Sequence, residues 1–478
     1  MVSKTDYDLC VIGGGAAGLV TAAGAATIGA KVILIEKHRL GGDCLYTGCV
    51  PSKTLIHSAE IAHSIKIAQR FGLSAQLDPI DQKKVMQRVV DVIKTIEPND
   101  SPDRFRALGV EVVFAEARFT AKDRLSVDDR EITARKFVLA TGSRPFVPPI
   151  SGLDNVDYFT NETIFNVTEN IPSLIVIGSG AIGCEMAQSF ARLGSKVSLL
   201  SNTGLLPIED ADMSAVVEQQ FLQDGITLHL GVMVNQVEKT ATGVRVHIKN
   251  DYKEHAIEIE GSHLLIATGR QSNVEHMGLD KAEVSIEKGQ LQVDARLRTS
   301  NKNIFACGDV AGPYLFTHMA EHQAGIVLRN ALFHLPAKTQ STGIPWCTFT
   351  APELARVGLS EQEAQQQAIQ YQVYTFPFSD IDRGITDGEM NGLAKIITTP
   401  KGKLLGACIV GPHAGELISE YVLAISQGLN VSALSNTIHI YPTLAQINRR
   451  VADQRMKEAL TPTRKCWIKR LFGLRGGD

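Results

Sequence analysis

The chain has 478 residues, which is enough for two to four domains of ordinary size. Its 44% hydrophobic and 21% charged residues are typical of a soluble globular protein. A formal net charge of −3 gives no electrostatic case for nucleic acid, and no apolar run reaches the roughly 18 residues of a membrane span. The first residues lead directly into a strand without a signal-peptide layout, so we expect a cytoplasmic protein with small-molecule partners.

A nucleotide-binding pattern opens the chain. An apolar strand is predicted over 7–12, followed by a glycine-rich turn over 13–18 and an alanine-rich helix to about Gly29. A second strand over 31–35 ends at Glu36, which completes a G-x-G-x-x-G turn with an acid about 20 residues on. The glycines let the backbone approach a pyrophosphate, the helix N-terminus stabilises its charge, and the acid can accept hydrogen bonds from a ribose.

The same design recurs later in the chain. A strand over 173–177 leads into a glycine-rich turn over 178–183, then a helix and a strand over 196–200. Each unit is followed by a strand ending in Ala-Thr-Gly, at 140–142 and at 267–269. Two such units predict two dinucleotides, either two cofactors or a cofactor and a cosubstrate.

Two cysteines lie five residues apart in the segment 41–53, directly after the first unit. Two glycines precede Cys44, and Pro-Ser-Lys53 follows soon after Cys49. This spacing is typical of a helix start, where the helix dipole lowers a thiol pKa and favours the thiolate. A zinc site is disfavoured because no second Cys/His pair has suitable spacing, and two inert buried cysteines would leave the flanking motif unexplained.

Together these motifs resemble the flavin-dependent class I pyridine-nucleotide disulfide oxidoreductases, which include glutathione reductase, dihydrolipoamide dehydrogenase and mercuric ion reductase. The resemblance covers nearly the whole chain and implies electron flow from a nicotinamide through FAD to a Cys44–Cys49 pair. It implies an α/β fold with two Rossmann-like domains and a C-terminal α+β dimerisation domain, and hence a homodimer with a shared active site. The expected boundaries are an FAD domain over 1–150 and 271–343, an NAD(P) domain over 151–270 and a dimerisation domain over 344–478.

The resemblance also implies residue roles. Cys49 would lie beside the flavin as the thiolate, and Cys44 would be the more exposed thiol that attacks substrate. Lys53 would stand near the flavin with Glu185 as its ion-pair partner, although each also reads as a solvated helix charge. No structural metal is expected, but the two cysteines are candidate transient ligands of Hg(II). The implied FAD-binding residues are Gly13, Gly15, Ala17, Gly18, Glu36, Gly42, Lys53, Ala115, Thr141, Gly142, Asp309 and Thr317. The implied NADPH- or NADH-binding residues are Gly178, Gly180, Gly183, Ser201, Val234, Gly269 and Arg270.

The C-terminal acid/base position departs from the family pattern. Glutathione reductase and dihydrolipoamide dehydrogenase carry His-Pro-Thr with a glutamate three residues beyond the threonine, and the partner subunit's histidine shuttles protons. Here Tyr441 and Gln446 stand at those positions. A tyrosine with a pKa of about 10 is a poor proton shuttle near neutrality. His439, two residues earlier, is a substitute candidate, but it also reads as a hydrogen-bonded interface histidine.

Several features bear on the electron acceptor. Mercuric ion reductase is similar in having a tyrosine near this point, and the segments 316–320, 378–383 and 409–417 resemble that branch. Typical mercuric reductases end in two adjacent cysteines, whereas this chain has only Cys466 there. We therefore expect reduction of a thiol-bound soft metal such as Hg(II), or of a disulfide. Dihydrolipoamide oxidation and a flavin-bound redox sensor with little turnover are the alternatives.

Two further questions stay open. Ser201 replaces the acid that NAD-specific members commonly carry, which favours NADPH, but no arginine follows it and Gly183 favours NADH. The tail 464–475 is a short basic amphipathic stretch. It could touch a membrane surface, pack on its own dimer or fray in solvent.

Overall fold

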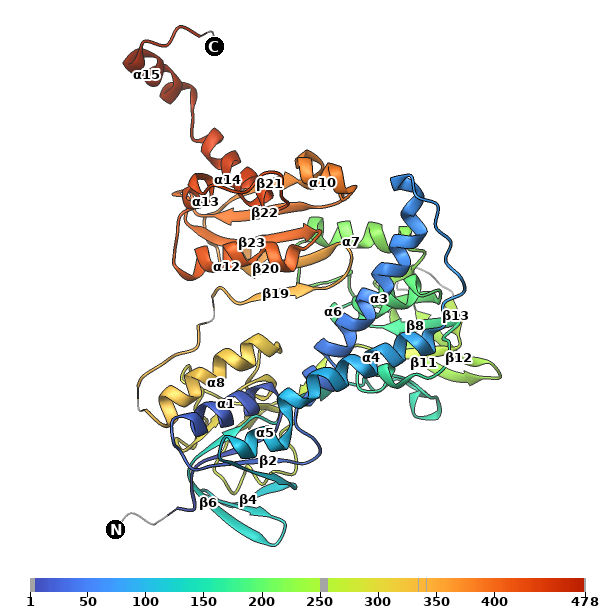
Figure 1. The fold of residues 1–478 in the computed structure, drawn as a ribbon, viewed down its shortest axis with the longest axis vertical. Coiled ribbons are helices and arrows are strands. Elements are labelled where there is room, and N and C mark those ends of the chain that lie inside the picture. Colours follow the sequence, from blue (N-terminus) through green and yellow to red (C-terminus); the bar gives the residue numbers. More distant parts are fainter. Residues whose placement is uncertain (1–4, 250–256, 334, 341, 477–478) are drawn as a thin grey trace. The chain divides into compact units, whose positions relative to one another are not determined.

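The structure, a computed structural model, describes residues 5–249, 257–333, 335–340 and 342–476 (Figure 1). These residues form two compact units. The first unit combines Met1–Thr203 with Ile226–Gln340, and the second combines Gly204–Gly225 with Ser341–Asp478.

The first unit contains the sheet of the N-terminal nucleotide-binding pattern. Its parallel part runs in the order β3-β2-β1-β6-β18, and β5 and β4 extend it as antiparallel strands beyond β6. The parallel strands are apolar and buried because helices cover a sheet of this kind on both faces. Helices α1 and α8 lie side by side (Figure 1). The elements are β1 (Tyr7–Ile12), α1 (Ala16–Thr27), β2 (Val32–Glu36), β3 (Val110–Phe114), β4 (Ala117–Ala121), β5 (Arg124–Val127), β6 (Arg130–Leu139), β18 (Ile304–Ala306) and α8 (Thr317–Ala331).

A second parallel sheet lies in the same unit, in the order β10-β9-β8-β14. An antiparallel sheet, β11-β12-β13, and a strand pair, β7-β15, accompany it. The bounds of the predicted strand over 173–177 agree with those of β8. The elements are β7 (Ser143–Pro145), β8 (Ser173–Ile177), α6 (Ala181–Arg192), β9 (Lys196–Ser201), β10 (Thr227–Leu230), β11 (Met233–Thr240), β12 (Gly243–Lys249), β13 (Ile257–Gly261), β14 (His263–Ile266) and β15 (Arg270–Ser272), with the small pair β16 (Ile286–Glu287) and β17 (Gln290–Leu291).

Helices between β2 and β3 carry the cysteine motif. They are α2 (Gly42–Tyr46), α3 (Cys49–Ile67), α4 (Gln82–Ile96) and α5 (Pro102–Ala107). Helix α3 packs against α4 and also against α6 of the second nucleotide-binding pattern. This packing brings the cysteine motif to the helix that follows the second glycine-rich turn.

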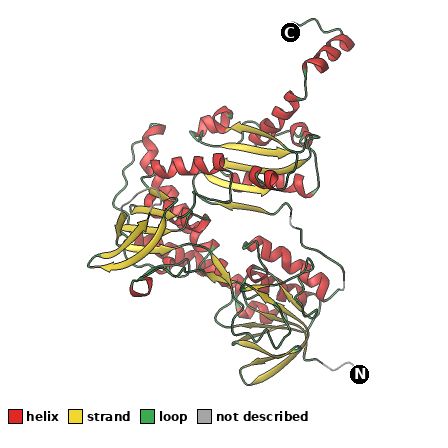
Figure 2. Ribbon diagram, turned by 180° about the vertical axis from the view of Figure 1, so that it is seen from behind, coloured by secondary structure: helices red, strands yellow, loops and turns green. Residues whose placement is uncertain are grey.

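The second unit is built on a five-stranded antiparallel sheet in the order β19-β20-β23-β22-β21. Figure 2 shows these strands with helices packed against them. The core lies between the sheet and α12 and α14, and includes Tyr421, Ile447 and Val451. The elements are β19 (Pro345–Thr348), β20 (Glu353–Gly358), α9 (Glu361–Gln366), β21 (Gln372–Pro377), α10 (Asp382–Asp387), β22 (Leu393–Thr398), β23 (Leu404–Gly411), α11 (Ala414–Leu417), α12 (Ser419–Ser426), α13 (Ser432–Asn436), α14 (Gln446–Glu458) and α15 (Pro462–Phe472).

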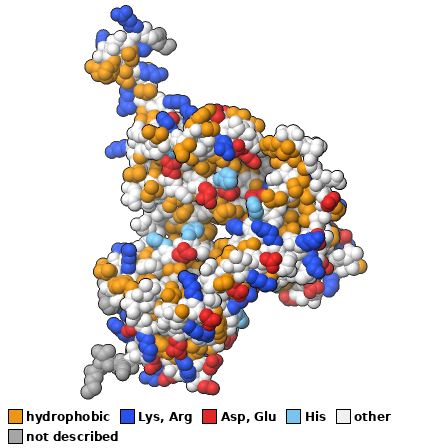
Figure 3. All heavy atoms as spheres, viewed as in Figure 1, with side chains coloured by type: hydrophobic (Ala, Val, Ile, Leu, Met, Phe, Trp, Pro, Cys, Tyr) orange, Lys and Arg blue, Asp and Glu red, His pale blue; other side chains and the backbone are white. Residues whose placement is uncertain are grey.

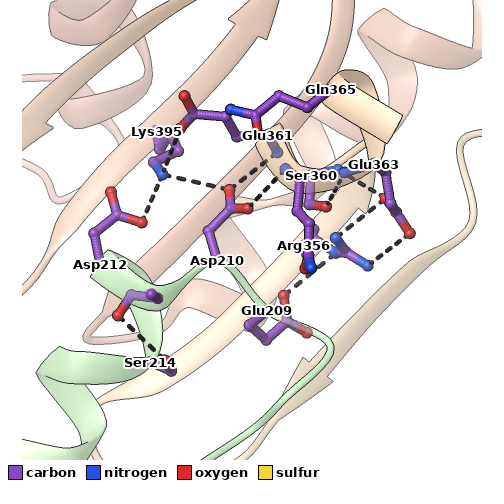
Figure 4. Close-up of polar contacts among 12 residues, drawn as sticks. Glu209, Asp210, Asp212, Ser214, Arg356, Ser360, Glu361, Glu363, Gln365 and Lys395 are labelled. Carbon is purple, nitrogen blue, oxygen red and sulfur yellow. Dashed lines mark hydrogen bonds and ion pairs between the residues drawn. The ribbon is translucent and has the colours of Figure 1, made fainter. Parts of the chain in front are cut away.

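Helix α7 (Ala211–Gln223) follows β9 in the chain but belongs to the second unit. It contacts β20 and β23. Acidic residues just before the helix and in its first turn form ion pairs with buried basic residues of the sheet (Figure 4). Lys395 Nζ lies 2.6 Å from Asp212 Oδ1 and 3.3 Å from Asp210 Oδ2. Arg356 Nε lies 3.3 Å from Glu209 Oε2. The predicted NAD(P) segment 151–270 therefore contributes residues 204–225 to the unit that contains the C-terminal sheet.

Candidate active site

The two cysteines of the motif stand at the start of a long helix. Cys44 lies in α2, and Cys49 is the first residue of α3, which is 19 residues long. The N-cap residue Gly48 has no side chain with which to cap the helix, so the end of the helix dipole acts on the Cys49 sulfur. Both cysteines are free thiols.

The two thiols ionise very differently. A hydrogen bond from Cys44 is the largest cause that lowers the pKa of Cys49 to about 6, and Thr317 and the charge of Lys53 lower it further. Burial and the charge of Asp43 act against this shift. The same hydrogen bond, with burial and the charge on Cys49, raises the pKa of Cys44 far above its usual range. The pair therefore holds one thiolate, on Cys49, with the Cys44 thiol as its hydrogen-bond donor.

Thr317 reaches this pair from a distant part of the chain. It is the first residue of α8, and its Oγ1 lies 3.4 Å from Cys49 Sγ. The exposures of the two cysteines are the reverse of the expected order, because Cys49 is exposed and Cys44 is half-buried. These exposures are those of the polypeptide alone, and a flavin beside Cys49 would cover its sulfur.

Lys53 and Glu185 form the ion pair that their family positions predict. Lys53 Nζ lies 3.0 Å from one Glu185 oxygen and 3.2 Å from the other. The Glu185 side chain is 6% exposed and that of Lys53 is 37% exposed. Glu185 is thus a buried carboxylate on α6 that holds Lys53 one turn of α3 beyond Cys49.

Asp43, which the sequence reasoning missed, organises the loop between the cysteines. Its Oδ1 accepts hydrogen bonds from Thr47 Oγ1 at 2.5 Å and from Asn161 Nδ2 at 3.1 Å. Its Oδ2 lies 3.3 Å from the guanidinium of Arg270. The available signal was an acid directly before Cys44, but its partners Asn161 and Arg270 are more than a hundred residues away and no local pattern identifies them.

Arg270 is held by side chains from three other segments of the first unit. Its Nε donates to Ser143 Oγ at 2.7 Å and lies 3.8 Å from Asp309 Oδ2. Ser143 in turn donates to Asp309 at 2.5 Å. Burial raises the pKa of Asp309, against the effects of Ser143 and Arg270. The Arg270 side chain, which is 10% exposed, therefore joins β15 to the cysteine loop and to the segment after β18.

The first glycine-rich turn has the shape of a dinucleotide cradle. A Cβ at Gly13 would lie 2.2 Å from the carbonyl oxygen of Ala140, and one at Gly18 would lie 1.8 Å from that of Gly13. These two glycines are required by packing. A Cβ at Gly15 would meet only Gly42 Cα, at 3.8 Å, so packing alone does not require this glycine. Close approach of a pyrophosphate to the N-terminus of α1 does require it, and the turn therefore fits a dinucleotide.

The second turn repeats this arrangement. A Cβ at Gly178 would lie 2.2 Å from the carbonyl oxygen of Ala267, and one at Gly183 would lie 2.0 Å from that of Gly178. A Cβ at Gly180 would have no atom within 4 Å. The middle glycine again leaves room for a phosphate at the N-terminus of a helix, α6, that no side chain caps.

The two nucleotide-binding patterns differ in the residue that ends their second strand, where a ribose would be bound. Glu36 Oε2 accepts from the backbone N–H of Gly14 at 2.7 Å, and this bond orients the carboxylate beside the first turn. At the corresponding position of the second turn, Ser201 is buried and its hydroxyl is bonded to Ser179 Oγ at 2.7 Å. The second turn therefore presents no carboxylate at this strand end.

The remaining predicted cofactor residues lie on the elements that surround these turns. Thr141 Oγ1 donates to the carbonyl oxygen of Asn273 at 2.7 Å, which ties the strand end after β6 to the segment after β15. The other positions are Ala17 in α1, Gly42 at the start of α2, Ala115 after β3, Gly142 after β6, Val234 in β11 and Gly269 before β15.

Tyr441 and His439 belong to the second unit and bind different helices. Tyr441 is 64% exposed, and its hydroxyl donates to Asp382 Oδ2 at 3.0 Å. This bond and the charge of Asp382 raise the pKa of Tyr441. His439 Nε2 lies 3.0 Å from Glu420 Oε1, and its Nδ1 lies 3.1 Å from the carbonyl oxygen of Thr437. The imidazole is thus hydrogen bonded through both nitrogens, to partners the sequence reasoning did not identify.

The residues that the structure describes contain no group of three or more His, Cys, Asp or Glu side chains arranged to hold a metal ion. None of the helices that the structure describes is long and apolar enough to cross a membrane.

Comparison with known proteins places this geometry in a family. Residues 7–324 match the family described as pyridine nucleotide-disulphide oxidoreductase, and residues 344–451 match its dimerisation domain. Mercuric reductase of Bacillus cereus is 34% identical over 92% of this chain and 70% of its own length. Dihydrolipoyl dehydrogenase of Thermus scotoductus is 36% identical over 95% of this chain and 98% of its own length.

A solved structure has the same fold. The Cu(II) complex of the HOCl-induced flavoprotein disulfide reductase RclA from Escherichia coli has a TM-score of 0.84 and 27% sequence identity, covering 94% of this chain and 100% of its own. The family uses FAD as its cofactor and NAD(P)H as its electron donor, and its dimerisation domain indicates a homodimer. The chain belongs to the pyridine nucleotide-disulphide oxidoreductase family.

Proposed function

We propose that this protein is a reductase that passes electrons from NAD(P)H through FAD and the Cys44–Cys49 dithiol to a soft metal ion held by thiols. The observation that carries the proposal is the ionisation of the pair. Cys49 is a thiolate near neutrality, with a pKa of about 6, and Cys44 is its hydrogen-bond donor. Thiolate sulfur is the ligand that soft metals such as Hg(II) select.

The residues of the first unit would hold the cofactor. Gly13, Gly15 and the N-terminus of α1 would bind the FAD pyrophosphate, Glu36 the adenosine ribose, and Asp309 the ribityl hydroxyls. When bound, FAD supplies the acceptance of a hydride from NAD(P)H and the transfer of two electrons to the sulfur pair. Lys53, which Glu185 holds in place, keeps a positive charge near Cys49 and stabilises its thiolate.

The chain's own groups determine the proton balance. When the Cys44 sulfur binds a metal or attacks a disulfide, the Cys49 thiolate can accept its proton through the existing hydrogen bond. Reduction of a disulfide to two thiols by this singly ionised pair consumes one further proton. Reduction of thiol-bound Hg(II) to Hg(0) by NAD(P)H takes two electrons and, when both ligands end as thiols, consumes one proton, which the departed thiolates take up from solution.

Tyr441 favours the metal as acceptor, because a thiolate leaves a metal ion by ligand exchange and can take up its proton in solution without a proton shuttle at this position. It stands where glutathione reductase and dihydrolipoamide dehydrogenase have the proton-shuttling histidine, and the bond to Asp382 raises its already high pKa. The mercuric reductase of Bacillus cereus and the Cu(II)-bound disulfide reductase from Escherichia coli support the same direction.

A disulfide or dihydrolipoamide substrate is the second candidate, and His439 favours it. The His439–Glu420 pair is a histidine and a carboxylate in hydrogen-bond contact, two residues before the expected position. Such a pair has the chemistry of an acid/base dyad. The similarity to dihydrolipoyl dehydrogenase supports this candidate.

The test is anaerobic stopped-flow mixing of the purified flavoprotein with NADPH or NADH, followed by steady-state NAD(P)H oxidation with several acceptors. The acceptors are Hg(II) or Cu(II) with excess thiol, oxidised glutathione and lipoamide. A long-wavelength thiolate–flavin band with turnover on a metal alone is the expected result. Turnover only on a disulfide would replace the metal by the second candidate, and rapid reduction with no turnover on any acceptor would indicate a redox sensor.

Matched cysteine variants separate the pair from the other thiols. Cys44→Ser and Cys49→Ser should each abolish metal turnover, and Cys49→Ser should also abolish the long-wavelength band. Cys466→Ser removes an exposed thiol outside the pair and should leave turnover unchanged. Loss of turnover in Cys466→Ser would show instead that the C-terminal cysteine delivers metal to the pair. Comparison of the reduction rates with NADPH and NADH tests whether Ser201 allows a 2′-phosphate.

A further inference from the structure

The C-terminal helix α15 does not pack into the protein. None of its residues is buried, although it contains four large apolar side chains. Trp467 is 69% exposed, Leu471 is 77% exposed and Phe472 is 68% exposed. Within its own chain, α15 therefore leaves these side chains uncovered.

The apolar residues of α15 lie along one face. Trp467 and Leu471 are four residues apart, and so are Ile468 and Phe472. Residues at this spacing are neighbours on a helix surface, so the four side chains form a single stripe. Figure 3 shows hydrophobic and basic side chains gathered side by side on this C-terminal segment. An exposed apolar stripe of this kind marks a surface that binds something.

The charge of the segment indicates what it binds. From residue 459 to residue 477 the sequence contains no aspartate or glutamate. The same stretch carries five basic residues, which are Arg464, Lys465, Lys469, Arg470 and Arg475. The chain as a whole has a net charge of −3, so this concentration of positive charge is local. Apolar and basic side chains on one short helix match the two layers of an anionic bilayer surface, its acyl chains and its headgroups.

The segment also lies outside the residues that match the family's two domains. The match to the dimerisation domain ends at residue 451, before α15 begins at Pro462. Helix α14 still contributes buried residues to the core of the second unit, whereas α15 contributes none. Packing within the second unit therefore does not account for the apolar side chains of α15.

We propose that α15 docks this protein on membranes rich in anionic phospholipid, with Trp467, Ile468, Leu471 and Phe472 inserted at the headgroup boundary. The basic residues bind the lipid phosphates. A homodimer carries two such helices, and binding of both to one surface strengthens attachment beyond that of one short helix. Electrons from NAD(P)H are then delivered to acceptors at the membrane surface.

The experiment is flotation of the full-length holoenzyme with vesicles of phosphatidylcholine, with and without phosphatidylglycerol. We expect binding only to the anionic vesicles, weaker at high salt, and lower by about tenfold or more in Lys465→Gln/Lys469→Gln/Arg470→Gln. Trp467→Ser/Leu471→Ser should lose binding to a similar extent. Trp467 fluorescence should shift to shorter wavelength on binding and should be quenched by brominated lipid.

A charge-matched control removes three basic residues elsewhere, in Lys338→Gln/Lys401→Gln/Lys403→Gln, all of which are exposed. This control should bind vesicles like the unchanged protein. Equal loss in the control, or no binding to anionic vesicles, would overturn the proposal. Protection of Trp467 from iodide quenching without lipid would also overturn it, because the stripe would then be covered by a second copy or another part of the dimer. Flavin reduction by NAD(P)H, measured on every variant, keeps failure of the enzymatic proposal separate from failure of this one.

Discussion

At the scale of single residues, the positive charge of Lys53 is one of the causes that keep Cys49 ionised near neutrality. The pKa of about 6 lies below the ordinary value of about 8.5. The thiolate therefore stabilises the folded protein above pH 8.5, and this contribution is lost as the pH falls through 6. We expect the long-wavelength flavin band of the reduced enzyme to disappear with a midpoint near pH 6. Lys53→Met should raise this midpoint, and Lys53→Arg should preserve it. Lys84→Met, at an exposed position of α4, serves as the control. A midpoint near 8.5 in the unchanged enzyme would contradict the assignment of the thiolate.

Asp43 acts on the same two sulfurs in the opposite direction. Its charge raises the pKa of both thiols, and its Oδ2 is paired with Arg270. Asp43→Asn should therefore move the band midpoint below that of the unchanged enzyme. It should also lower the thermal midpoint of flavin release by roughly 2–4 °C, because the half-exposed ion pair is worth only about 1 kcal/mol. Asp123→Asn, at an exposed surface carboxylate, should change neither quantity. A raised midpoint would mean that Asp43 acts through loop geometry and not through its charge.

At the scale of secondary-structure elements, α7 depends on a lysine in the C-terminal sheet. Lys395 on β22 is 3% exposed and contacts Asp210, Asp212 and Glu361 (Figure 4). Lys395→Met would leave the buried Asp210 without its cation, at a cost of about 3–5 kcal/mol. We expect faster amide hydrogen exchange throughout α7 in this variant, and partial recovery when Asp210→Asn is added. Exposed Lys401→Met is the control. Unchanged exchange in α7 would show that its apolar contacts alone hold it to the sheet.

At the scale of the whole molecule, the homodimer expected from the dimerisation domain should use the apolar segment around Tyr441. Ile438 is 92% exposed and Ile440 is 79% exposed, and Tyr441 follows at 64%. Three such side chains in four residues are costly to leave in water. Ile438→Asp/Ile440→Asp should give a monomer by light scattering coupled to size-exclusion chromatography. Leu73→Asp, which charges a 63% exposed leucine in the first unit, should remain a dimer. A dimeric double variant would place the interface elsewhere.

The sequence by itself determined the nucleotide-binding strands, both glycine-rich turns and the helix start at Cys49. These features depend on neighbours within a few residues, where alternation, glycine spacing and helix caps apply. The class of fold followed from the family resemblance that these motifs carry, and the family comparison confirms it.

Only the tertiary structure decided how the site is assembled. Thr317 meets Cys49 across 268 residues of sequence, and Lys53 meets Glu185 across 132. Family resemblance anticipated the second pair, but no local pattern predicts the bond between Asp43 and Arg270 or that between His439 and Glu420. The tertiary structure also placed α7 with the C-terminal sheet, although the chain order puts α7 inside the second nucleotide-binding pattern. The physical reason is that a hydrogen bond or ion pair requires two atoms to meet in space, and chain spacing specifies such meetings only within one element or turn.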